Sequence, residues 1–346
     1  MTSKRIYTGF DLIKLIAAVG IIAIHTHAPF LNVAGRLGVP FFAIVSGFLF
    51  FNHYQQLTNA EEQRSYLRKF CKRIFFLYAI WQVIYIPIAI HQFRVIMASL
   101  KGFSVKNLMI YVIDFIFPAV YNAQGVDLTK DANGWGPSWY LLASIVAMPV
   151  FIFLLKIFRN HVIPVLLLCL FIEIFIILSD EFGSITHLEP IFNHTFLRLL
   201  IYFCLGYILV KYNEQIKAWP QQRSIVFFAL LFCLFFAENL LVHFYSGTYT
   251  TEEIITTVPT GFMLAVVAIN FQPKLTHPVQ VRNLSTFLYC FQIWPIVVLE
   301  KLLEIVSLKG QYILLFILVM LVSLVAAYIY EWLCKRFNWG FLKYMV

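Results

Sequence analysis

Residues 11–51 read DLIKLIAAVGIIAIHTHAPFLNVAGRLGVPFFAIVSGFLFF, and this stretch decides how the rest of the chain is interpreted. It is apolar over the length of two membrane helices, yet its first half carries Asp11, Lys14 and His25. On an α-helix the three side chains share one face, with Lys14 and His25 about 16 Å apart along the axis. Ionisable groups inside a membrane span are costly unless they pair or line a cavity. This face is therefore the first candidate for a functional site.

The second half of the stretch, from Arg36 to Phe51, is a further apolar run with Pro40 near its start. It contains the pair Ser46-Gly47, and small residues in a membrane helix let another backbone or a ligand approach closely. We therefore expect a close contact at Ser46 and Gly47.

Composition places the chain among polytopic membrane proteins of the all-α class. Of its 346 residues, 61% are hydrophobic and 12% are charged, and the mean hydropathy is +0.81. Apolar runs fill nearly the whole length, so we expect one integral-membrane domain over residues 1–346, with its first span retained and not cleaved as a signal peptide. The net charge of +9 is typical of basic cytoplasmic loops, and we expect no nucleic-acid partner.

Eleven apolar runs are candidate spans. They fall near residues 8–28, 36–51, 74–92, 107–121, 138–155, 162–178, 195–212, 224–242, 254–271, 285–300 and 311–333. If 107–121 is a short re-entrant or interfacial helix and the other ten cross, 17 Lys and Arg residues lie on one side and 8 on the other. The positive-inside rule then predicts about ten transmembrane helices with both termini in the cytoplasm.

A metal site is the rival interpretation of His25, because His25-x-His27 is a ligand pair by residue type. Two residues apart on a helix, however, the rings point about 200° apart. The six cysteines are scattered singly, without the paired spacing of a thiolate site. We expect no metal. The other alternative is that His25 is a polar residue at the outer end of a span, satisfied by water.

Three further features have open interpretations. Residues Arg64–Arg73 are expected to form a loop with five basic residues, which indicate either topology and anionic-lipid contact or a site for phosphates. Trp135 and Trp139 lie where a span begins, as interface anchors or as a platform for sugar rings. Arg198 opens a span on the outer side and is expected to hold Glu173, Glu238 or an anionic acceptor.

The motifs together resemble a known family, the acyltransferase 3 family of integral-membrane acyltransferases. The resemblance is carried by Asp11-x-x-Lys14-x(10)-His25, Arg36-Leu-Gly-Val-Pro-Phe-Phe, Ser46-Gly47-Phe-Leu, Lys72-Arg73-Ile, Trp139-Tyr-Leu, Leu205-Gly-Tyr and Leu284-Ser-Thr-Phe-Leu-Tyr. Two positions depart from the family. Lys14 stands where the family usually has arginine, and Gln292 stands where its late helix often has histidine.

The resemblance implies a bacterial inner-membrane enzyme that moves an acyl group, usually acetyl from acetyl-CoA, to a hydroxyl of a cell-surface glycan or lipid-linked oligosaccharide. His25 is then the general base. Asp11 and Lys14 shape the donor channel within the lipid bilayer, where Lys14 meets the phosphates of the cofactor and Asp11 holds Lys14 by a contact between residues three apart on the helix. Residues expected to contact coenzyme A are Arg68, Lys69, Lys72, Arg73, Ser46 and Gly47. Residues expected to contact the acceptor are Arg36, Trp135, Trp139 and Arg198.

A transporter or flippase is the alternative from another class. A stripe with an acid, a lysine and a histidine is equally expected where a membrane protein moves protons or a polar substrate. Consumption of acyl-CoA by the purified protein separates the two interpretations.

Overall fold

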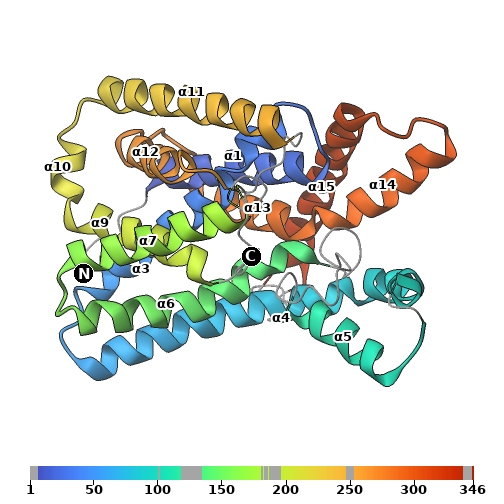
Figure 1. The fold of residues 1–346 in the computed structure, drawn as a ribbon, viewed down its shortest axis with the longest axis horizontal. Helices are drawn as coiled ribbons and strands as arrows, with labels where there is room; N and C mark the ends of the chain where they lie inside the picture. The colour runs from blue at the N-terminus through green and yellow to red at the C-terminus, as the bar shows by residue number, and fades with distance from the viewer. Residues whose placement is uncertain are drawn as a thin grey trace.

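The computed structural model describes residues 7–99, 102–117, 135–180, 182, 186, 196–246, 253–337 and 345–346. Within these residues all regular structure is helical, which confirms the predicted all-α class. The helices in Figure 1 are α1 (Thr8–His25), α2 (Leu31–Gly35), α3 (Gly38–Tyr54), α4 (Ala60–Ser99), α5 (Val105–Ile116), the 3-10 turn η1 (Gly136–Ser138), α6 (Trp139–Ile157), α7 (Val162–Asp180), α9 (Leu197–Lys211), α10 (Asn213–Lys217), α11 (Gln221–Ser246), α12 (Thr257–Asn270), α13 (Pro278–Phe291), α14 (Ile293–Ile305) and α15 (Tyr312–Arg336).

The lengths and hydropathy of these helices are those of a multi-pass membrane protein. In the described part of the chain, seven helical segments are long and apolar enough to cross a membrane, and α13 with α14 forms an eighth if the 51° bend between them lies within one span. Helices α9 and α12 have only 15 and 14 residues. The number of ten spans therefore stays a prediction. Helix α5 is about 18 Å long, too short to cross alone, as expected for the stretch after residue 107.

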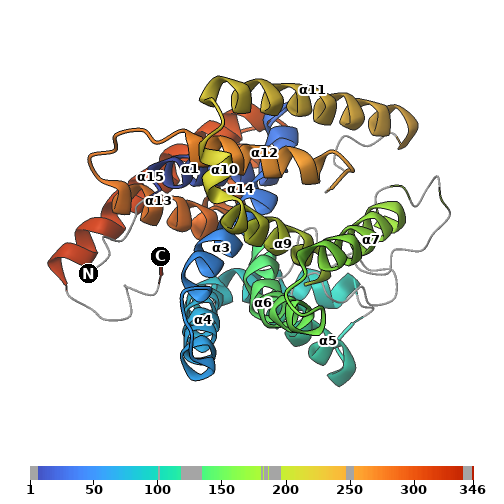
Figure 2. The same cartoon turned by 90° about the vertical axis from the view of Figure 1, so that its left-hand side faces the viewer.

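Glycines bring the central helices into backbone contact. A methyl group on Gly206 of α9 would lie 2.5 Å from the carbonyl oxygen of Ile44, and one on Gly47 of α3 would lie 3.2 Å from the Cα atom of Phe203. Helices α3 and α9 therefore pack at a distance that a larger residue would increase. The span that contains α3 is the most enclosed, with 67% of its window buried, against 17% for α11 at the edge of the bundle (Figure 2).

The start of α1 defines one end of the bundle, which we call the N-terminal end (Figure 1). There Thr8 Oγ1 donates a hydrogen bond of 3.3 Å to Gln272 Oε1, just beyond α12. A pocket beside this contact reaches Lys217 of α10. The turn between α6 and α7 meets Lys211, the last residue of α9, at the same end. Helix α1 finishes at His25, so His25 lies toward the opposite end.

The basic segment 64–73 is helical, so its description as a loop is wrong. It forms part of α4, whose 40 residues extend about 60 Å, roughly twice the thickness of a hydrocarbon core. Two glutamates in the first turn and several straight-chain side chains favour the helix. The side chains of Arg68, Lys69, Lys72 and Arg73 are all exposed.

Candidate functional site

Helix α1 carries Asp11, Lys14 and His25 on one unbroken helix, as predicted. The rise of an α-helix therefore places Lys14 and His25 about 16 Å apart along its axis. Asp11 is buried, whereas Lys14 and His25 are each partly exposed. His25 is the last residue of the helix.

Asp11 forms a two-pronged ion pair with Arg282 of α13. The Nε atom of Arg282 lies 2.8 Å from Asp11 Oδ1, and its second guanidinium nitrogen lies 3.0 Å from Oδ2. The planar fork of arginine matches both carboxylate oxygens, which makes this the strong form of the contact. The predicted contact between Asp11 and Lys14 is replaced by this pair among the described residues. Arg282 was missed because it is 271 residues away in sequence.

Positive charge gathers around Lys14 at the N-terminal half of α1. Asp11, Arg282 and Arg73 all lie within electrostatic range of the Lys14 ammonium group. We call Asp11, Lys14, Arg73 and Arg282 the basic cluster, because Lys14 lies near two further cations and one carboxylate. The Arg282 side chain remains 42% exposed, so its guanidinium can still meet a ligand. The other cations of α4 extend the charge along an exposed face, where the Lys72 ammonium lies 5.7 Å from the centre of the Phe76 ring.

Close packing of α1 and α2 positions Arg36 in the same region as His25. A methyl group on Gly35 would lie 2.1 Å from the carbonyl oxygen of Gly20 and 3.0 Å from the Ile24 side chain. Gly35 precedes Arg36 and Ile24 precedes His25. The close contact between Gly35 and Ile24 therefore lies next to both candidate residues.

His27 has a different setting from His25. It takes a left-handed backbone conformation with φ of 54°, and its ring lies 6.0 Å from the ring of Tyr312. Among the described residues there is no group of three His, Cys, Asp or Glu side chains arranged for a metal ion. The absence of a metal stays a prediction.

Ser46 and Gly47 serve contacts within the protein. Ser46 Oγ lies 3.4 Å from the Tyr140 hydroxyl, and Gly47 faces the backbone of Phe203. Gly47 therefore acts in packing α3 against α9, and its surroundings give no support to a contact with coenzyme A.

Trp135 is neither an interface anchor nor an exposed platform. Its side chain is fully buried and stacks on Tyr85, with ring centres 5.5 Å apart and planes 9° apart. The ring centre of Trp81 lies 6.1 Å from that of Trp135, and Trp294 also stacks on Tyr85. Trp139 is partly exposed and meets Tyr140 edge-on. We call Trp81, Tyr85, Trp135, Tyr289 and Trp294 the aromatic cluster.

Polar atoms at the aromatic cluster have unused hydrogen-bonding capacity. The buried atoms Gln82 Oε1, Trp135 Nε1, Gln292 Oε1 and Trp294 Nε1 have no hydrogen-bond partner among the described residues. Gln292 lies at the bend between α13 and α14. Buried polar atoms are nearly always satisfied, so several in one region indicate a place where a polar ligand group can bind.

Arg198 is paired with an acid inside the protein. Its Nε atom lies 3.1 Å from a carboxylate oxygen of Glu253, with both side chains almost completely buried. Glu173 and Tyr202 lie within electrostatic range of this pair. Glu238 instead accepts hydrogen bonds of 3.0 and 2.8 Å from the backbone at Ile255 and Thr256, at the start of α12.

These features define an all-helical membrane protein with a basic cluster at one end of α1 and a histidine toward the other. A family model described as an acyltransferase domain matches residues 7–332. The chain therefore belongs to the acyltransferase 3 family, which its motifs resemble.

Two curated relatives carry a different name. Both are amino-acid racemases of Enterococcus faecalis, one 24% identical over 296 residues and the other 20% identical over 348 residues. The alignments cover 79% and 94% of this chain but only 37% and 46% of the racemases. The chain thus spans less than half the length of either relative. No solved structure matches the chain significantly.

Proposed function

We propose that the protein is a membrane O-acyltransferase, which moves an acetyl or related acyl group from cytoplasmic acyl-CoA to a hydroxyl of a cell-envelope polysaccharide or lipid-linked glycan. The observation that carries this proposal is the ion pair between Asp11 and Arg282. The pair holds the Arg282 guanidinium near Lys14. Lys14 belongs to α1, the helix that ends in His25. Helix α1 therefore carries both a cation that can bind the donor, Lys14, and a group that can accept a proton, His25. Family membership supports the same reaction.

The basic cluster is the proposed site for the phosphates of coenzyme A. Lys14, Arg73 and Arg282 supply charge-assisted hydrogen bonds, and Asp11 fixes the orientation of Arg282. Further cations on the exposed face of α4 attract the donor from solution. They are Arg68, Lys69 and Lys72.

The positions of the aromatic cluster and Gln292 along their helices fit a donor that extends from the basic cluster toward His25. Trp81 lies eight residues beyond Arg73 on α4, or about 12 Å, which places the aromatic cluster part of the way to His25. Gln292 lies ten residues beyond Arg282, or about 15 Å, close to the separation of Lys14 from His25. The unsatisfied amide and indole atoms described above suit the amide groups of a pantetheine arm.

His25 is the proposed general base. An imidazole exchanges protons near neutral pH, so it can accept the proton of an attacking hydroxyl. As that oxygen bonds to the thioester carbonyl carbon, the carbon–sulfur bond breaks, and His25 returns the proton to the leaving sulfur. Such a base contributes typically about 10²–10⁴-fold to the rate. Acyl-CoA supplies the activated thioester in this reaction.

The proposed location is the bacterial cytoplasmic membrane, with both termini and the N-terminal end of the bundle in the cytoplasm. Single cysteines at Lys274 and Lys309, in a background without other cysteines, test this orientation. Both positions are exposed. Position 274 lies two residues beyond Gln272, which bonds Thr8 at the N-terminal end, and position 309 lies three residues before Tyr312, whose ring meets His27 beyond the other end of α1. On intact cells an impermeant maleimide should label position 309 and spare position 274. The reverse pattern would place the basic cluster outside, away from cytoplasmic acyl-CoA.

The reaction itself is tested with the purified chain and with cells. Purified protein should consume acetyl-CoA when envelope glycan is added, and mass analysis should show an acyl group on that glycan only when the gene is present. If acetyl-CoA is untouched and glycans are identical with and without the gene, the proposal fails and a transporter becomes the better interpretation.

A further inference from the structure

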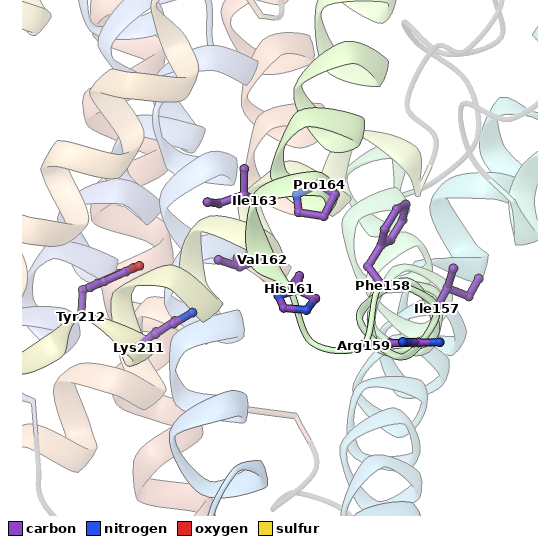
Figure 3. Close-up of a pocket in the computed structure, with 9 residues that line it drawn as sticks. All are labelled: Ile157, Phe158, Arg159, His161, Val162, Ile163, Pro164, Lys211 and Tyr212. Atoms are coloured by element: carbon purple, nitrogen blue, oxygen red, sulfur yellow. The ribbon is translucent and has the colours of Figure 1, made fainter.

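A pocket of about 460 Å³ lies at the N-terminal end of the bundle, away from the residues assigned to acyl transfer. The turn between α6 and α7 forms one wall, and the end of α9 forms the other (Figure 3). Its lining consists of Ile157, Phe158, Arg159, His161, Val162, Ile163, Pro164, Lys211 and Tyr212.

All the ionisable lining groups apart from the Tyr212 phenol are basic. Arg159 and His161 come from the turn, and Lys211 comes from the last residue of α9. No aspartate or glutamate is among the nine lining residues, so the charge is not neutralised within the pocket. In Figure 3 His161 lies between Lys211 and Arg159. Helix α7 also begins here at Val162, and a helix start is favourable for an anion.

The turn holds its basic side chains in a defined backbone geometry. Arg159 and Asn160 have φ values of 50° and 61°, in the left-handed region that residues other than glycine seldom adopt. Hydrogen bonds fix this shape, including one of 2.7 Å from the Asn160 amide to the carbonyl oxygen of Leu155. The position of Arg159 is therefore set by the turn.

The same pocket has an apolar side. Ile157 and Ile163 are 54% and 68% exposed, and they belong to the ends of α6 and α7, which are long and apolar enough to cross a membrane. In a bilayer such side chains face lipid chains, directly beside the three basic groups. A ligand that fits both parts carries a negative head group attached to apolar chains.

We propose that this pocket binds the phosphate-bearing head group of an anionic phospholipid, with Arg159, His161 and Lys211 around the phosphate and Ile157 and Ile163 against the acyl chains. This binding is independent of the proposed reaction. It would attach the α6–α7 turn and α9 to the membrane surface on the side where the basic cluster also lies.

Lipid retention tests the proposal. The full chain is reconstituted in nanodiscs of equimolar phosphatidylcholine and phosphatidylglycerol, extracted gently, and its bound lipids are counted by native mass spectrometry. We expect bound phosphatidylglycerol on the wild type and about a tenfold loss or more in R159Q/K211Q, because two charge-assisted contacts disappear. Phosphatidylcholine retention should not change.

The matched control is K274Q/R336Q, which removes the same charges from two exposed residues outside the pocket. It should retain phosphatidylglycerol like the wild type. An equal loss in both double variants would show only general attraction to a basic surface and would overturn the site. If R159Q/K211Q fails to insert, K211Q alone changes an exposed side chain and gives the same comparison.

Competition separates a lipid from a soluble phosphate. Glycerol phosphate and inorganic phosphate should leave the bound phosphatidylglycerol in place, because neither reproduces the contacts with Ile157 and Ile163. Displacement of the lipid by either compound at matched concentration would show that the pocket recognises phosphate alone, and the lipid proposal would be wrong.

Discussion

Two ion pairs in this protein have the same chemistry and opposite surroundings. Arg282 meets Asp11 at 2.8 Å with its side chain 42% exposed, whereas Arg198 meets Glu253 at 3.1 Å with its side chain 1% exposed. The first arginine lies near another cation, Lys14, and the second lies near a further acid, Glu173. The open pair therefore has positive charge left for a ligand, whereas in the closed pair the charge of the arginine is already used within the fold.

The difference shows why an arginine at the end of a membrane helix is not by itself evidence of a binding site. Sequence patterns left Arg198 with Glu173, Glu238 or an anionic acceptor as its partner, and they did not find Arg282. Loss of Arg198 leaves Glu253 and Glu173 in a region of low dielectric without this cation, whereas loss of Arg282 leaves the buried Asp11 carboxylate with Lys14 still within electrostatic range. Exposure therefore predicts which arginine acts in stability and which acts in binding.

The largest expected effect concerns the closed pair. Arg198→Ala leaves Glu253 and Glu173 buried without their cation, so we expect a loss of about 3–5 kcal/mol in the free energy of unfolding. Thermal unfolding in detergent and the amount of protein inserted in membranes measure this loss. Arg198→Lys keeps the charge and should lie between the wild type and the alanine variant. A stable Arg198→Ala protein that has lost only glycan acylation would show that this pair serves the acceptor after all.

The next effect concerns the open pair. Arg282→Ala should weaken acyl-CoA binding about tenfold, since one charge-assisted contact disappears, and it should lower the free energy of unfolding by less than Arg198→Ala does, because the buried Asp11 carboxylate keeps the Lys14 ammonium group within electrostatic range. Equilibrium binding of labelled acyl-CoA to the purified protein measures the affinity. Lys335→Ala is the control, because Lys335 is an exposed cation of the same end that pairs with Glu331. Equal affinities of Arg282→Ala and wild type would contradict the donor site.

Two substitutions of Lys14 test whether a positive charge in the basic cluster is needed for donor binding. Lys14→Arg keeps the charge and introduces the usual family residue, so donor binding should be retained. Lys14→Ala should weaken binding about tenfold, by the same loss of one charge-assisted contact. If both variants bind acyl-CoA alike, the charge at this position has no part in donor recognition.

The smallest effect concerns Glu238, an acid that accepts hydrogen bonds from the backbone of Ile255 and Thr256 and from the Thr256 hydroxyl. Glu238→Gln keeps one acceptor oxygen at the start of α12 and loses the negative charge, so we expect about 1 kcal/mol of destabilisation. Hydrogen exchange should speed up in the first turn of α12. An effect as large as that of Arg198→Ala would mean that Glu238 belongs to a larger buried network.

Much of the fold could be predicted because apolar runs of spanning length indicate membrane helices. The apolar runs correspond to α1, α3, α4, α5, α6, α7, α9, α11, α12, α13 with α14, and α15. The register of Asp11, Lys14 and His25 follows from the rise and turn of one helix, and it was predicted correctly. The helical form of 64–73 was missed because a dense run of charge in a membrane protein is typical of a loop.

The partners of the site residues could not be predicted in the same way. Asp11 was expected to contact Lys14 because residues three apart meet on a helix, but packing of α1 on α13 brought a better-shaped partner from 271 residues away. Trp135 was placed at a membrane interface by its position before a span, and only the packing of Tyr85 shows that it is buried. Contacts between distant segments leave no periodic trace in a single sequence.

The central claim is that His25 acts as the base in acyl transfer, and one measurement tests it most directly. Transfer of labelled acetyl from acetyl-CoA to envelope glycan is measured for the wild type, His25→Gln and His27→Gln, each inserted normally. The glutamine at position 25 keeps a hydrogen bond but cannot carry the proton, so we predict a rate about 10²–10⁴-fold lower with acyl-CoA affinity unchanged. His27→Gln alters an exposed ring two residues away and should transfer acetyl at the wild-type rate. Near-normal transfer by His25→Gln would contradict the mechanism and make the imidazole structural.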